Sequence, residues 1–115
     1  MTRFSLALVV AFFLSTAASL QAQGLGGSYT LEGRDNVTLE IRQVTLVPPI
    51  YVAAVYVNGE IKENESMFIY PTTEGWVWEN VQGNEGTVAQ DDDGDLDVEV
   101  TTGPNTGKKT HWNRQ

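Results

Sequence analysis

The 115-residue chain contains 15 acidic and 7 basic residues, which gives a formal net charge of −8, and it has no cysteine. Nucleic acids and anionic membrane surfaces would repel such a chain, so its charge excludes them as expected partners and favours a basic protein or a cation. Without cysteine there is no thiol nucleophile and no disulfide. Stability must therefore come from packing and strand pairing.

The N-terminal residues have the pattern of a secretory signal peptide. A basic residue precedes the apolar run Leu6–Leu14, which is too short to span a bilayer comfortably, and small residues follow it. Cleavage is expected after Ala22. Cleavage after Ser19 and retention as an N-terminal anchor are the alternatives. We therefore expect a signal peptide over residues 1–22, one domain over residues 23–115, secretion or periplasmic export, and no stable membrane anchor after cleavage.

The first part of the domain alternates apolar and polar residues with the period of two that strands require. Tyr29 and Leu31 share one face of a first strand, and residues 32–36 are expected to form a turn. Residues 37–42 alternate again, and after Gln43 the alternation changes phase. One inserted residue, a β-bulge, is the expected cause.

Two short signals mark the limits of the next strand. Pro48-Pro49 should end the preceding strand, because neither residue can donate to a ladder. Residues 50–57 are apolar on both faces and are expected to form the most buried strand. Asn58-Gly59 predicts a two-residue hairpin turn with positive φ at both positions, which would pair Tyr56 with Ile61.

A strand over residues 67–70, ended by Pro71, should precede a strand that carries two tryptophans. One face of that second strand would carry Trp76, Trp78, Asn80 and Gln82, and the other face Val77, Glu79 and Val81. Burying a carboxylate costs more than burying an amide, so we expect the tryptophan face to point inward. An outward aromatic patch is the alternative. A two-residue turn at Gly83-Asn84 should follow.

The acidic segment Asp92-Asp93-Gly94 predicts a three-residue loop that would pair Val88 with Val98. A two-residue Asp-Gly turn is the alternative. The last expected strand, residues 108–114, carries Thr110 and Trp112 on one face. The sum is an all-β fold: a small antiparallel up-and-down meander of eight or nine strands, closed into a barrel or a sandwich.

Two short features resemble the calycin group of small ligand-binding barrels. Gly27-Ser28-Tyr29 lies near the first strand, where those proteins usually carry Gly-x-Trp, and Arg114 lies near the end, where they often have a basic residue. The tyrosine departs from the usual tryptophan. The resemblance implies a closed barrel with a ligand site, by analogy at the level of the fold.

The sequence contains no catalytic signature. His111 is the only histidine, and a nucleophile–base–acid triad would need it to meet Ser28 or Ser66, neither of which lies in a nucleophile-elbow pattern. One histidine with carboxylates is a poor zinc set. We therefore expect a protein that is not an enzyme and has no cofactor, with a hydrolase as a remote alternative.

The aspartates Asp91, Asp93 and Asp95 are weak candidates for a calcium site. When Gly94 is aligned with the glycine of an EF-hand loop, residues without carboxylates fall at the first and last ligand positions. A solvated turn that keeps the molecule soluble is the alternative and the expected outcome.

The aromatic residues supply the candidates for a binding site. Inward-facing indoles with a neighbouring amide could line a small apolar cavity with a polar mouth, whereas core packing alone is the alternative. The candidate ligand residues are Tyr56, Trp76, Trp78, Asn80 and Trp112. We expect a non-enzymatic barrel that binds a small apolar or amphipathic ligand. The alternative is an acidic protein-interaction module, such as an inhibitor or an envelope component.

Overall fold

The computed structural model describes residues 24–115, so the signal peptide expected over residues 1–22 lies outside the described residues. The described chain forms nine strands and one 3-10 helix. These are β1 (Gly27–Leu31), β2 (Arg34–Leu46), β3 (Pro49–Val57), β4 (Glu60–Ile61), η1 (Glu63–Glu65), β5 (Met67–Thr72), β6 (Gly75–Asn80), β7 (Glu85–Gln90), β8 (Leu96–Thr102) and β9 (Lys109–Arg114). Within this part of the chain, no helix is long and apolar enough to cross a lipid bilayer.

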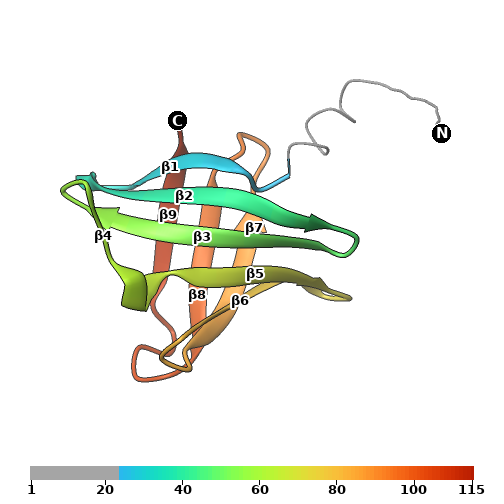
Figure 1. Cartoon of the computed structure of the whole chain (residues 1–115). Helices are drawn as coiled ribbons and strands as arrows, with labels where there is room; N and C mark the ends of the chain where they lie inside the picture. Colours follow the sequence, from blue (N-terminus) through green and yellow to red (C-terminus); the bar gives the residue numbers. More distant parts are fainter. Residues whose placement is uncertain (1–23) are drawn as a thin grey trace, which may run out of the picture.

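The strands form one antiparallel sheet that closes on itself. Its order is β2-β1-β9-β8-β7-β6-β5-β3-β4, and β2 also pairs with β3. That pairing closes an eight-stranded barrel, with β4 as a short addition at the end of β3. In Figure 1, β1, β2, β3 and β5 cross in front of β7–β9 at a steep angle. The predicted all-β meander is confirmed, and of its two forms the structure has the barrel.

The barrel interior contains the apolar residue of each alternating pair. In β2 the inward residues Val37, Leu39 and Ile41 are buried, and polar residues between them face outward. None of the buried residues in the described chain is charged, and each fully buried aliphatic side chain contributes about 1.5–3 kcal/mol. The largest side chains with almost no exposed surface are Leu25, Tyr29, Leu39, Ile69 and Leu96.

Three local predictions about register are confirmed. Gln43 pairs with Tyr51 while Thr45 pairs with Ile50, so the extra residue of the bulge lies between them. Asn58 and Gly59 have φ of 54° and 82°, as the predicted turn requires, and Tyr56 pairs with Ile61. At the acidic loop, Val88 pairs with Val98.

The predicted turn at Gly83-Asn84 is wrong. Strand β6 ends at Asn80, and the loop runs through Gln82 and Gly83, which has φ of 86°. The Asn80 side-chain oxygen accepts hydrogen bonds from the backbone N–H groups of Gln82 (3.0 Å) and Asn84 (3.1 Å). A short amide side chain that bonds forward to the backbone favours a turn over a ladder, which explains why Gln82 leaves the strand.

Two other predicted strand ends also differ. Pro71 lies inside β5 and pairs with Trp76. The ladder between β3 and β5 extends only to Ile69, so a proline beyond it interrupts none of that ladder's hydrogen bonds. The turn predicted over residues 32–36 is shorter, because β2 already starts at Arg34.

Candidate ligand site at the open end of the barrel

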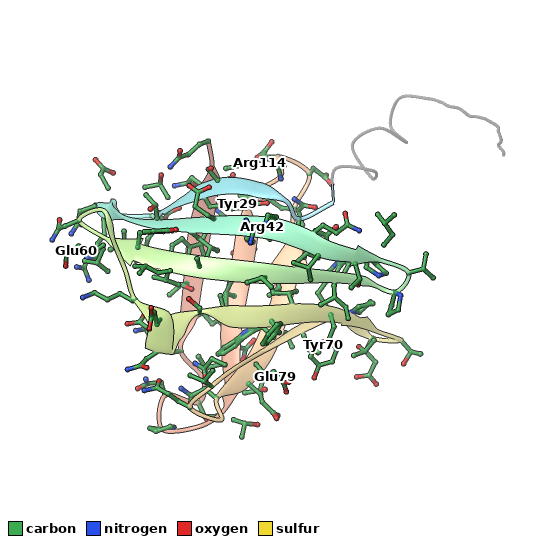
Figure 2. The ribbon with its side chains drawn as sticks, in the orientation of Figure 1. Tyr29, Arg42, Glu60, Tyr70, Glu79 and Arg114 are labelled. Carbon is green, nitrogen blue, oxygen red and sulfur yellow. The ribbon has the colours of Figure 1, made fainter. Side chains whose placement is uncertain are left out.

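One end of the barrel is closed by the contact between its first and last strands. The Tyr29 side chain has no exposed surface, and its hydroxyl donates to the Leu25 carbonyl at 2.6 Å. The Arg114 guanidinium donates to the Tyr29 hydroxyl at 2.8 Å and to the Gly26 carbonyl at 2.5 Å, and lies 5.3 Å from the Tyr29 ring centroid. Figure 2 labels both residues at the same edge. Tyr29 and Arg114, which belong to the two features that resemble calycins, are therefore in direct contact.

Two positions beside Arg114 leave room for its side chain. A Cβ added at Gly27 would lie 3.1 Å from Nη2, and one at Gly94 would lie 3.0 Å from Cδ. Burial raises the pKa of the Tyr29 phenol, and the nearby guanidinium partly offsets that increase. With the phenol neutral and its oxygen fully bonded, this end is a packed plug rather than an entrance.

The opposite end contains a cavity of about 480 Å³. This volume lies within the range of about 300–1,000 Å³ that is common for small-ligand sites. Its wall is apolar and comes from seven of the eight barrel strands. The wall residues are Leu31, Val37, Val55, Val57, Met67, Trp78, Val98, Val100 and Trp112.

Polar side chains surround the mouth of this cavity. They come from the ends of strands, from η1, and from the loops that join β6 to β7 and β8 to β9. The rim residues are Arg34, Glu65, Asn80, Gln82, Asn84, Asn105, Lys108 and Thr110. An apolar floor below a polar rim fits a ligand with one apolar and one polar end.

The indole of Trp78 forms part of the wall and is held across a neighbouring strand. Its side chain is 5% exposed, and its Nε1–H donates to the Glu99 carbonyl at 3.2 Å. Strand β7 lies between them, and Trp78 pairs there with Gly86. Glycine at this position lets the ring cross the strand, since a Cβ would overlap both the ring and the Glu99 carbonyl.

The indole of Trp112 forms the wall on the β9 side. Its side chain is 7% exposed, and its Nε1–H donates to the Thr110 hydroxyl at 3.0 Å. Thr110 is two residues away and therefore points to the same interior. Because both indole N–H groups are bonded within the protein, the two rings present apolar faces and edges to the cavity.

The five residues predicted to bind ligand separate into two groups. Trp78, Asn80 and Trp112 line the cavity. Trp76 does not line the cavity. It lies two residues before Trp78 on β6, and its ring packs edge-on against that of Tyr51, with centroids 5.5 Å apart. Tyr56 does not either. It pairs with Thr38 on the outward face of the sheet and lines a shallow groove there.

Sequence reasoning missed the two basic residues of the rim. Lys108 could have been found, because the same period of two that orients Trp112 and Thr110 continues to it. Arg34 had no such signal. It reaches the inward face because the register between β1 and β2 is irregular and pairs Arg34 directly with the inward residue Leu31.

The three candidate calcium ligands do lie together. Carboxylate oxygens of Asp91, Asp93 and Asp95 lie within 4.8 Å of one another, mostly exposed. One oxygen of Asp91 already accepts the backbone N–H groups of Asp93 and Asp95, each at 3.0 Å. These bonds shape the loop, as short aspartate side chains commonly do in turns.

His111 lies on the outer surface among carboxylates. Its Nδ1 lies 2.7 Å from Asp97, and its Nε2 lies 3.4 Å from Asp95 and 3.8 Å from Glu32. The hydrogen bond that the imidazole donates to the Asp97 carboxylate, together with the neighbouring negative charges, raises the pKa of His111. Neither Ser28 nor Ser66 is among the partners of His111, so the described chain places no serine nucleophile beside this histidine.

Comparisons with protein-family models, with curated proteins and with solved structures found no match.

Proposed function

We propose that this protein is a non-enzymatic barrel that binds a small amphipathic ligand in the cavity at its open end. The observation that carries this proposal is the asymmetry of the barrel. One end is plugged by Tyr29 and Arg114, whereas the other holds about 480 Å³ of space with an apolar wall and a polar rim. A ligand would bury its apolar part beside Trp78 and Trp112 and leave its polar part at the mouth.

Burial of apolar ligand surface supplies the binding free energy, at about 25 cal/mol per Å² removed from water. The indoles of Trp78 and Trp112 are already oriented by hydrogen bonds, so little side-chain entropy is lost when a ligand enters. Asn80 lines the cavity at the end of β6, and a second polar side chain, Thr110, lies across the barrel. Both could orient the polar group of a ligand.

A neutral apolar dye, N-phenyl-1-naphthylamine, tests the proposal. Its fluorescence should rise on mixing with the protein, and Val100→Trp should weaken binding by about tenfold or more by filling the cavity. Val77→Trp is the matched control, because Val77 lies on β6 but points away from the cavity, and it should bind the dye normally. Equal binding by the two variants, or no binding by the native protein, would contradict the proposal.

The second candidate function is an acidic protein-interaction surface. It is favoured by one observation: of the 15 acidic residues, only Glu65 lines the cavity, so the negative charge is concentrated on the outside. A basic protein partner should then bind with an affinity that falls steeply with ionic strength. Binding that is unchanged by Val100→Trp but abolished by salt would support this candidate instead.

A further inference from the structure

The charge around the cavity mouth has the opposite sign to the charge of the whole protein. Within residues 24–115, the cavity is lined by two of the six basic residues, Arg34 and Lys108, and by only one of the 15 acidic residues, Glu65. The remaining surface carries the excess of carboxylates. A cationic mouth on an anionic molecule is a local feature that the overall charge does not predict.

The positions of Lys108 and Arg34 in the chain direct both side chains toward the cavity mouth. Lys108 immediately precedes β9 and continues the inward series of Trp112 and Thr110. Arg34 pairs with Leu31, whose side chain packs against the core, and residues that pair directly across two strands point to the same face. The two side chains therefore extend over one opening, Arg34 from the first residue of β2 and Lys108 from the loop before β9.

Within the described part of the chain, no carboxylate forms an ion pair with either cation. Over residues 24–115, each ion pair within 4.0 Å involves His111, and none involves Arg34 or Lys108. Arg114 differs from both, because its guanidinium is used by Tyr29 and Gly26 in the plug. The donors of Arg34 and Lys108 remain available to a ligand group at the mouth.

We propose that the ligand is an amphipathic anion, whose apolar part enters the barrel while its carboxylate or similar acidic group binds Arg34 and Lys108. This inference rests on the proposed function and adds the chemical class of the ligand. The apolar wall gives the affinity, and the two cations give the preference for an acidic group. Guanidinium and ammonium donors bind carboxylates through charge-assisted hydrogen bonds, which are stronger than neutral ones.

Three probes with the same eight-carbon chain test the inference: octanoate, octanol and octyltrimethylammonium. Calorimetric titration at low salt should show octanoate binding about three- to tenfold more tightly than octanol, and the ammonium probe most weakly. These are the changes expected for two mouth cations that remain exposed to solvent. At 0.5 M NaCl the preference should shrink, because salt screens exposed charges.

The variant Arg34→Gln/Lys108→Gln should remove the preference for octanoate while leaving octanol binding unchanged. Arg42→Gln/Lys62→Gln is the matched control, since it removes the same charge outside the cavity lining, and it should keep the preference. All four side chains are exposed, so both variants should fold.

The possible failures can be told apart. If octanol and octanoate bind equally and the double variant changes neither, the inference about the acidic group is overturned and the proposed function stands. If the control variant loses the preference as fully as Arg34→Gln/Lys108→Gln, the preference comes from net charge, and the assignment to these two residues is overturned. If none of the three probes binds, the proposed function and the inference fail together.

Discussion

Replacing Gly86 by alanine should destabilise the barrel through Trp78. An alanine Cβ at this position would overlap the Glu99 carbonyl oxygen and would lie 2.7 Å from Cε2 of the indole, well inside van der Waals contact. Neither neighbour can move alone, because one is the backbone of β8 and the other is a buried ring that is 5% exposed. The ring must shift and release its hydrogen bond to Glu99.

The expected loss combines two effects. Overpacking a closely packed core costs about 1–3 kcal/mol, and the lost Trp78–Glu99 hydrogen bond costs about 1 kcal/mol. Gly86→Ala should therefore lower the free energy of unfolding by about 2–4 kcal/mol. For a domain of this size, that lowers the melting temperature by about 10–25 °C.

Urea denaturation followed by far-ultraviolet circular dichroism measures this loss. The control is Thr87→Ala, at the next residue of β7, whose side chain is exposed on the outer face. It should change the free energy of unfolding by less than about 1 kcal/mol. If Gly86→Ala unfolds at the same urea concentration as the native protein, the close passage of Trp78 over β7 is refuted.

The other predictions concern the surface of the barrel. Gly59→Val should cost about 1–3 kcal/mol, because valine is strained at positive φ, and an unchanged denaturation midpoint would contradict the assigned turn. His111 has a raised pKa in the folded state, so its ion pairs stabilise the fold below the unfolded value of about 6.5 and stop doing so as pH rises through the folded pKa. His111→Gln should therefore lower the melting temperature at pH 5.5 and leave it nearly unchanged at pH 9, and an equal loss at both pH values would refute this. Millimolar calcium should leave the melting temperature within about 2 °C, whereas a larger rise that Asp93→Asn removes would reveal a site.

Local patterns in the sequence were sufficient to predict most of the barrel. The phase change after Gln43 located the bulge, and the Asn58-Gly59 and Asp92–Gly94 signals gave the correct registers, because each depends on a few neighbouring residues. The turn after β6 was mispredicted because the Asn80 side chain competes with the ladder. A local hydrogen bond from the backbone to a side chain is not visible in an alternation of apolar residues.

The candidate site was predicted only in part, because alternation gives the face of a strand but not the end of the barrel. Trp76 and Trp78 belong to the same inward series, yet only Trp78 lines the cavity, since the strand crosses from the packed end to the open one. Tyr56 lies on a strand that is apolar on both faces, so its direction depended on the pairing with β2. Arg34 depended on an irregular register that no periodicity predicts.

The three tryptophan indole N–H groups allow the most direct test of ligand binding at the open end. In two-dimensional ¹H–¹⁵N spectra each indole gives its own signal, and Trp78 and Trp112 line the cavity whereas Trp76 does not. Titration with octanol should shift the signals of Trp78 and Trp112 and leave the signal of Trp76 in place. Saturating octanol that shifts none of the three signals, or that shifts the signal of Trp76 alone, would contradict binding in this cavity.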